Sequence, residues 1–143
     1  MADQAKLIAL DLGERRIGLA VSGPGGMALP AGHIVRTKLD QDVQQVIAAA
    51  TERKADGIVV GIPHNPQGKT DIAAKLARGF IRAIRKAIND DSPLSIYEMD
   101  ERFTSVEAEG LLRESGVEPS RDRASVDETA AVLILQRYLA TQA

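Results

Sequence analysis

Residues 7–21, near the start of the chain, read Leu-Ile-Ala-Leu-Asp-Leu-Gly-Glu-Arg-Arg-Ile-Gly-Leu-Ala-Val. Two apolar runs, 7–12 and 17–21, are separated by Gly-Glu-Arg-Arg. This pattern predicts two antiparallel strands joined by a tight turn. A third apolar segment, 27–35, follows the glycine-rich residues 23–26. We therefore expect the chain to begin with a three-stranded antiparallel meander.

After residue 35 the spacing of the apolar residues alternates between helical and strand-like. Helical spacing over 71–89 places Ile72, Leu76 and Phe80 on one face, which we expect to point inward. Thr104-Ser-Val-Glu107 and Ser125-Val-Asp-Glu128 are capping boxes that would begin the last two helices. The expected elements after the meander are a helix at 40–54, a strand at 57–62, a helix at 71–89, a strand at 94–99, and helices from 104 to about 115 and from about 125 to 139.

This order of elements predicts the fold class. A meander followed by two strand–helix–strand crossovers gives one mixed sheet with helices packed on its faces. The 143 residues are enough for one domain, so we expect a single α/β domain spanning 1–143.

The composition excludes several kinds of protein and of site. A hydrophobic fraction of 44% and a charged fraction of 27% are ordinary for a globular domain and exclude a disordered chain. The absence of cysteine excludes disulfides, thiolate zinc sites and cysteine nucleophiles. We find no signal peptide and no apolar stretch of the ~18 residues that span a bilayer, so we expect a cytoplasmic protein. The net charge of −2 does not indicate a nucleic-acid partner, although local basic patches would suffice to bind one.

Asp11 and Glu101 are acids at unusual positions in predicted strands. Asp11 lies inside an apolar strand, where a charge is costly to bury; alternatively, it starts the following turn. Glu101 stands at the carboxyl end of the last strand, the edge at which open α/β sheets bind ligands. Because side chains alternate along a strand, Glu101 lies on the same face as Tyr97 and Met99, which argues against simple exposure to solvent. Two alternatives remain: Glu101 is simply exposed to solvent at the end of its strand, or Asp100 has the functional role instead of Glu101.

Asp127 is the third acid of interest, in the expected first turn of the last helix. Helical periodicity puts it on one face with Ala131, Ile134 and Tyr138, the face that packs on the sheet. Its alternative role is to stabilise the helix N-terminus, although Glu128 in the capping box would also do this.

The three acids together indicate a catalytic site. If both strands end near the start of the last helix, three carboxylates converge there and repel one another unless a cation neutralises them. Carboxylate oxygens suit Mg²⁺ or Mn²⁺, and such ions activate water for attack on a phosphodiester. Phosphodiester hydrolysis is therefore the expected chemistry.

Four short motifs follow one another along the chain. The first is Ala9-Leu-Asp-Leu-Gly-Glu-Arg-Arg-Ile-Gly-Leu-Ala-Val-Ser22. The second is Val59-Val-Gly-Ile-Pro63, running on to Gly68, and the third is Asp100-Glu-Arg-Phe-Thr104. The last combines Ser125-Val-Asp127 with Ala130-Ala-Val-Leu-Ile-Leu-Gln136. Taken in this order, the four motifs resemble those of the YqgF family, also called RuvX. The set covers nearly the whole chain, and its order makes the resemblance specific.

This resemblance implies a ribonuclease H-like fold, with sheet order 3-2-1-4-5 and strand 2 antiparallel. It implies that Asp11, Glu101 and Asp127 are catalytic carboxylates that hold Mg²⁺ or Mn²⁺. The implied activity is processing of the 5′ end of precursor 16S ribosomal RNA, or resolution of four-way Holliday junction DNA. Related nucleases often carry a fourth acid one turn after the third, where this chain has Ala130 and Ala131, so the number of metal ions stays open.

Basic and polar residues near the predicted site are candidates for binding nucleic acid. Aromatic residues make up only 3% of the chain, so we expect recognition of the backbone and shape rather than stacking of bases. Ribosomal particles are a further expected partner, and the protein is either a monomer or a homodimer, because two symmetric junction cuts need a dimer. The candidate contacts are Arg15, Arg16, Asn65, Lys69, Arg102, Arg121 and Arg123.

Two other functions compete with the nuclease. The run from Asp11 to Gly18 also resembles the first phosphate motif of the actin and sugar-kinase superfamily, but that superfamily uses two such domains and a second glycine-rich loop. The other competitor is a non-catalytic RNA-binding factor of ribosome assembly that keeps the fold. The intact set of three acids argues against this second alternative.

Overall fold

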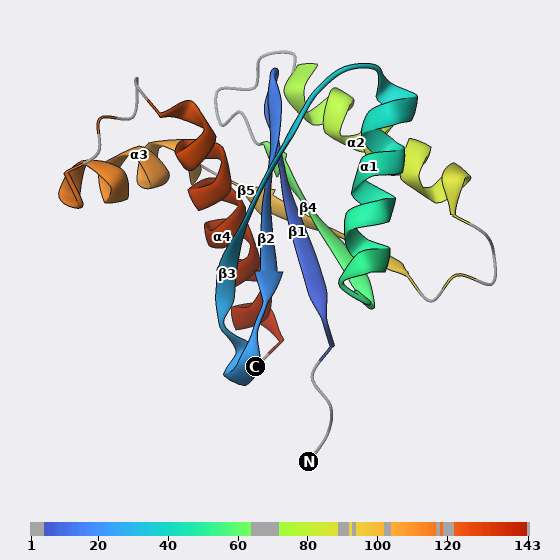
Figure 1. Cartoon of the computed structure of the whole chain (residues 1–143), viewed down its shortest axis with the longest axis horizontal. Helices are drawn as coiled ribbons and strands as arrows, with labels where there is room; N and C mark the ends of the chain where they lie inside the picture. Colours follow the sequence, from blue (N-terminus) through green and yellow to red (C-terminus); the bar gives the residue numbers. More distant parts are fainter. Residues whose placement is uncertain are drawn as a thin grey trace.

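The computed structural model describes residues 5–63, 72–88, 92, 94–101, 104–116, 118 and 122–142. Their elements follow the predicted order and form one five-stranded sheet flanked by helices (Figure 1). The strands are β1 (Leu7–Leu12), β2 (Arg16–Ser22), β3 (Ala28–Val35), β4 (Gly57–Pro63) and β5 (Ser95–Glu101). The helices are α1 (Leu39–Glu52), α2 (Ile72–Ala87), α3 (Thr104–Glu114) and α4 (Arg123–Thr141), with a short 3-10 turn, η1, at Pro24–Gly26.

The strand order is β3-β2-β1-β4-β5, which confirms the predicted mixed sheet. β2 pairs antiparallel with both β1 and β3, whereas β1, β4 and β5 run parallel. The three parallel strands therefore end at the same edge of the sheet. The positions of Asp11 in β1 and Glu101 in β5 place both acids toward this edge.

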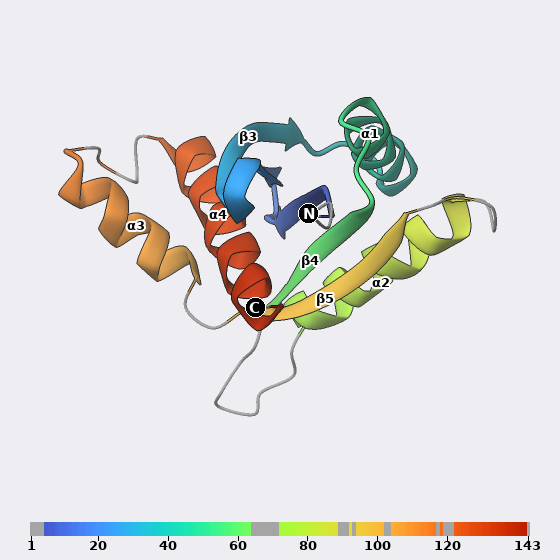
Figure 2. The ribbon, with the colours of Figure 1, turned by 90° about the horizontal axis from the view of Figure 1, so that it is seen from below.

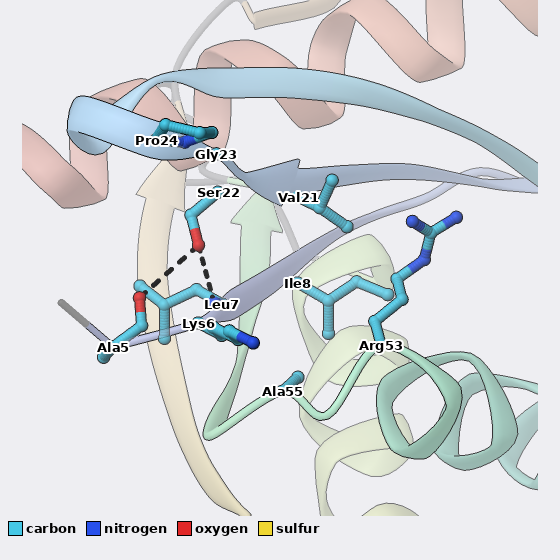
Figure 3. A pocket seen from close by; sticks show the side chains of 10 residues that line it. All are labelled: Ala5, Lys6, Leu7, Ile8, Val21, Ser22, Gly23, Pro24, Arg53 and Ala55. Atoms are coloured by element: carbon cyan, nitrogen blue, oxygen red, sulfur yellow. Dashed lines mark hydrogen bonds between the residues drawn. The ribbon is translucent and has the colours of Figure 1, made fainter. Parts of the chain in front are cut away.

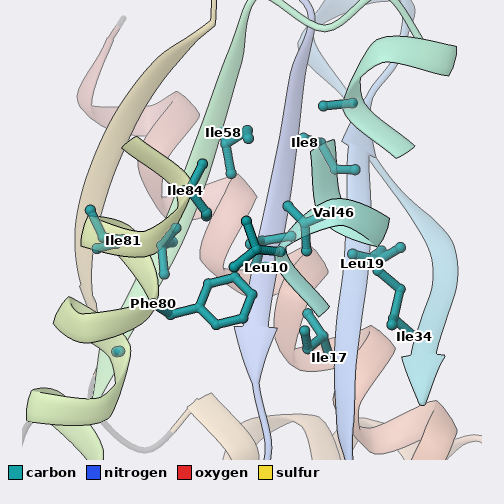
Figure 4. Close-up of a cluster of buried hydrophobic side chains, with 14 of the residues drawn as sticks. Ile8, Leu10, Ile17, Leu19, Ile34, Val46, Ile58, Phe80, Ile81 and Ile84 are labelled. Atoms are coloured by element: carbon teal, nitrogen blue, oxygen red, sulfur yellow. The ribbon is translucent and has the colours of Figure 1, made fainter. Parts of the chain in front are cut away.

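Helices cover both faces of the sheet. Figure 2 shows α4 on one side of the strands and α1 and α2 on the other. The larger core lies under α1 and α2 and contains Ile8, Leu10 and Phe80 (Figure 4). The smaller core lies under α4 and contains Leu7 and Ala9. Because side chains alternate along a strand, Asp11 belongs to the face of α4.

The inward face of α2 differs from the prediction in its first two turns. Ile72 and Leu76 are 64% and 68% exposed, whereas Ala74 and Ala77 are buried. Small alanines allow the start of the helix to pack closely on its neighbours, and the bulky residues are left outside. Phe80 is buried as predicted.

The last helix begins earlier than its predicted capping box. α4 starts at Arg123, and Asp122 is the N-cap because its side chain accepts a hydrogen bond from the Ser125 N–H at 3.0 Å. Glu128 instead accepts a hydrogen bond from the N–H of Gly32 in β3. Asp127 therefore lies in the second turn, and its predicted place in the first turn was wrong. The side chains of the other capping box lie outside the described residues.

No helix in the described part of the chain is both long enough and apolar enough to cross a membrane.

Candidate active site

The three predicted carboxylates line one cavity of about 530 Å³ at the end of the parallel strands. Asp11 comes from β1, Glu101 is the last residue of β5, and Asp127 comes from α4. Segments far apart in the sequence thus meet at one place. The full lining is Asp11, Leu12, Gly13, Glu14, Arg15, Arg16, Pro63, Glu101, Arg123 and Asp127. We call this cavity the acidic pocket.

The orientation of β5 distinguishes Glu101 from its neighbour Asp100. The Oε2 atom of Glu101 is buried and lies 3.1 Å from the point where a Cβ on Gly61 would stand. Glu101 therefore folds back over β4, the strand next to Asp11. Asp100 is exposed and does not line the acidic pocket. Of these two acids, only Glu101 is placed to act with Asp11.

A glycine in β2 allows α4 to bring Asp127 close to Asp11. Gly18 is the register partner of Asp11 in the antiparallel pair. A Cβ on Gly18 would overlap the backbone carbonyl of Asp127 and would lie 2.9 Å from the amide nitrogen of Glu128. The Oδ1 atom of Asp127 is also close to the β1–β2 turn, 3.6 Å from the Cβ position of Gly13. The backbone of α4 thus packs directly on β2 at the level of Asp11.

The electrostatics of the acidic pocket disfavour three ionised carboxylates. Burial raises the pKa of Asp11 well above its usual value, and the charges of Glu101 and Asp127 raise it further. Asp11 is only 6% exposed. Burial also raises the pKa of Asp127, whereas Arg123, Arg16 and His33 act in the opposite direction. Asp11 is therefore repelled by the other two carboxylates, and a cation bound between them would relieve this repulsion.

Three of the predicted nucleic-acid contacts line the acidic pocket: Arg15, Arg16 and Arg123. Arg15 is exposed on the turn, and Arg16 is the first residue of β2. Arg123 Nη1 forms an ion pair with Glu109 Oε1 of α3 at 2.9 Å, which directs its guanidinium toward α3. The other four candidates, Asn65, Lys69, Arg102 and Arg121, lie outside the described residues.

Sequence reasoning did not select two further residues beside the pocket. His33 of β3 pairs with Gly18, and its charge acts on both Asp122 and Asp127. Arg36 follows β3 and donates from Nη1 to the carbonyl of Gly13 at 2.9 Å. Neither belongs to a recognisable local motif, and both come close to residues of the pocket only because β3 folds back beside β2. A single sequence carries no signal of this contact.

The donor set has the right chemistry for a hard divalent cation. It consists of carboxylate oxygens on buried or half-buried side chains whose charges repel one another. Among the described residues, however, no three Asp, Glu, His or Cys side chains form a group that could hold a metal ion in the present geometry. An ion shared by all three acids would require their side chains to turn toward it. Glu128 does not join them, because it is bonded to Gly32.

A second cavity, of about 520 Å³, lies at the amino-terminal end of β1 (Figure 3). Its lining is mainly apolar, with Lys6 and Arg53 as its charged residues and no carboxylate. Ser22 Oγ accepts a hydrogen bond from the Leu7 N–H at 2.8 Å at its edge. None of its lining residues is a carboxylate, histidine or cysteine that could hold a metal ion, so the acidic pocket is the candidate active site.

Comparison with known proteins relates the chain to nucleases. The family model described as "RuvX: Holliday junction resolvase" matches residues 5–141. A protein of Synechococcus elongatus named "Putative pre-16S rRNA nuclease" is 38% identical over 136 residues, covering 94% of this chain and 89% of the relative. A protein of the same name from Rhodococcus erythropolis is 36% identical over 141 residues, covering 95% and 78%.

Solved structures with the same fold include two resolvases bound to DNA. T. thermophilus RuvC in complex with a Holliday junction substrate has a TM-score of 0.59 and 14% identity, covering 97% of this chain and 96% of that one. The complex of Fowlpox virus resolvase with Holliday junction DNA has a TM-score of 0.57 and 11% identity, covering 96% and 98%. At such low identity the likeness shows the fold alone, which is the ribonuclease H-like fold implied by the sequence motifs.

Proposed function

Because the chain belongs to the family described as "RuvX: Holliday junction resolvase", and its relatives are named as nucleases, we propose that it is a metal-dependent nuclease acting on structured nucleic acid. The convergence of Asp11, Glu101 and Asp127 in one pocket carries this proposal. The chain acts as a single nuclease domain, 1–143, and works in the cytoplasm.

The three carboxylates are the proposed ligands of Mg²⁺ or Mn²⁺. Such an ion, when bound, activates water and stabilises the leaving oxygen of a phosphodiester. Asp11 is the central ligand, because it is the most buried of the three and is influenced by both other acids. Glu101 lies over β4 and Asp127 lies over β2, the two strands that flank β1.

The basic residues of the pocket hold the substrate in this proposal. Arg15 and Arg16 stand on the turn beside Asp11 and would bind phosphates on either side of the scissile bond. Arg123 would bind the substrate when its ion pair with Glu109 is broken. In this proposal the acids therefore hold the metal ion for the reaction, and the arginines bind the nucleic-acid backbone.

The proposed substrate is precursor 16S ribosomal RNA, trimmed at its 5′ end. Support comes from relatives at 34–38% identity over most of the chain, which carry the name of a pre-16S rRNA nuclease. Ribosomal particles would then be the natural partner, and a monomer would suffice.

Four-way DNA junctions are the second candidate substrate. The observation in their favour is the shared fold of resolvases whose structures contain junction DNA. Two symmetric cuts in a junction would require a homodimer.

Cleavage assays would test the proposal. The two substrates would be a labelled four-way junction and a labelled precursor 16S 5′-leader RNA, each incubated with Mn²⁺, Mg²⁺ or EDTA. The control variant is Asp100→Asn, which changes an exposed acid next to Glu101 outside the pocket. We expect cleavage that requires metal, is lost in Asp11→Asn and persists in Asp100→Asn. A folded, metal-binding protein that cleaves neither substrate would instead favour a non-catalytic RNA-binding assembly factor, and tight binding of ATP would favour an actin-like domain.

A further inference from the structure

Arg36 holds both sides of the turn that joins β1 to β2. Its backbone N–H donates to the carbonyl of Arg15 at 2.8 Å, and its Nη1 donates to the carbonyl of Gly13 at 2.9 Å. The turn is closed internally by a hydrogen bond from the Gly13 N–H to the carbonyl of Arg16 at 2.9 Å. One residue from outside the turn therefore binds two of its carbonyl groups.

The guanidinium of Arg36 is itself held in place from two helices. Its Nε pairs with Oδ2 of Asp42 in α1 at 3.3 Å, and the group lies over the ring of Phe80 in α2, 5.7 Å from the ring centre. Asp42 is only 1% exposed and also accepts a hydrogen bond from the Thr37 N–H at 2.9 Å. The fork of Arg36 thus connects the turn to the core under α1 and α2.

The turn held by Arg36 forms one wall of the acidic pocket. It starts two residues after Asp11 and contains Arg15 and Arg16. Asp127 Oδ1 lies 3.6 Å from the Cβ position of Gly13, the residue whose carbonyl Arg36 binds. A shift of this turn would therefore move two basic residues and the neighbourhood of Asp127 relative to Asp11.

We propose that Arg36, fixed by Asp42, is a positioning residue that sets the geometry of the acidic pocket from outside it. This inference rests on the proposed nuclease function, because its consequence is a correctly placed catalytic turn. Lysine cannot replace Arg36, because an ammonium group has no planar fork with which to bind a carbonyl and a carboxylate at once. Within the described part of the chain, the Asp42 carboxylate contacts Arg36 and both the backbone N–H and the hydroxyl of Thr37.

The test compares Arg36→Lys and Asp42→Asn with two controls. Arg78→Lys makes the same change in an exposed ion pair with Glu98 on another part of the surface. Ile84→Val removes one buried methyl group from the same core, so it reproduces a loss of stability without touching the turn. All variants would be assayed below their melting temperatures for kcat and KM. Hydrogen exchange of the Gly13 amide would be measured with Ile58 in β4 as reference.

We expect Arg36→Lys to accelerate exchange at Gly13 by at least about tenfold, with Ile58 unchanged. We expect it to lower kcat by ~10- to 100-fold with little change in KM, since small misplacements of reacting groups have effects of this size. Asp42→Asn should act in the same direction, and both controls should keep the kcat of the unaltered protein. Unchanged exchange at Gly13, or a kcat no lower than that of Ile84→Val, would overturn the inference. A protein without cleavage activity would contradict the proposed function, and exchange at Gly13 would still decide whether Arg36 holds the turn.

Discussion

Gly18 of β2 and Asp127 of α4 are in direct backbone contact, so closely that the space for a Cβ on Gly18 is taken by the Asp127 carbonyl. Gly18 is also the register partner of Asp11. The missing side chain therefore determines how near the helix that carries one acid comes to the strand that carries another. We consider this contact the structural basis of the acidic pocket.

Replacing Gly18 by alanine should push α4 away from the sheet. We expect Gly18→Ala to lower the free energy of unfolding by about 1–3 kcal/mol, the usual range for overpacking in a core. Nuclease activity should fall as well, because Asp127 moves with the helix. Thermal or urea unfolding measures the first effect and cleavage assays the second.

The matched control for this substitution is Gly110→Ala in α3, where a Cβ meets nothing within 4 Å. Alanine is the better helix former by about 1 kcal/mol, so this variant should be as stable as the original protein or more so. If Gly18→Ala were as stable and as active as Gly110→Ala, the contact between β2 and α4 would not have the importance given to it here.

Asp11→Asn should stabilise the metal-free protein at neutral pH. The folded state raises the pKa of Asp11, so the native state binds more protons than the unfolded chain at pH values between the ordinary value of 3.8 and the raised one. The free energy of unfolding therefore falls as pH rises through this window. At higher pH it stays lowered, because ionised Asp11 is then buried, and this is the penalty. Asparagine has no such penalty.

Thermal unfolding in EDTA at several pH values would test whether Asp11→Asn stabilises the protein. The melting temperature of Asp11→Asn should exceed that of the original protein at pH 7, and the difference should shrink as pH falls toward 3.8. A lower melting temperature for Asp11→Asn at pH 7 would show that the carboxylate stabilises the fold, the opposite of the expected effect.

Arg16→Gln should weaken the binding of nucleic acid through the loss of one phosphate contact. A plot of the logarithm of the binding constant against the logarithm of salt concentration has a negative slope. The magnitude of this slope should be smaller by about 1 in the variant. Arg53→Gln, at the cavity on the opposite end of β1, serves as the control and should leave the slope unchanged. Equal salt slopes for the two variants would remove Arg16 from the proposed interface.

The sequence predicted the convergence of the acids because local rules were sufficient for it. The alternation of side chains in β5 separates Glu101 from Asp100, and the shared direction of β1 and β5 takes Asp11 and Glu101 to one edge of the sheet. The apolar face of α4 turns Asp127 toward that sheet. The strand order itself was implied by the family motifs.

Contacts between distant residues explain what the sequence did not predict. Glu128 fits a capping box by spacing, but it bonds to Gly32, 96 residues away, and Asp122 caps the helix instead. The contact between Arg36 and Gly13 likewise depends on how β3 returns beside β2. Neither interaction has a local pattern. In α2, the small residues Ala74 and Ala77 face the core because they allow close packing. Helical periodicity favours the bulky apolar residues for this face and therefore predicts the wrong one for the start of the helix.

Calorimetric titration with Mn²⁺ would show whether Asp11, Glu101 and Asp127 together bind a divalent cation. We expect the original protein to bind Mn²⁺. Asp11→Asn and Glu101→Gln should each weaken this binding by at least about tenfold, because the loss of even an outer-shell partner of a metal has an effect of this size. Asp100→Asn should bind as the original protein does. Equal affinity for Mn²⁺ in Asp11→Asn and in the original protein would show that these three acids do not form the cation site.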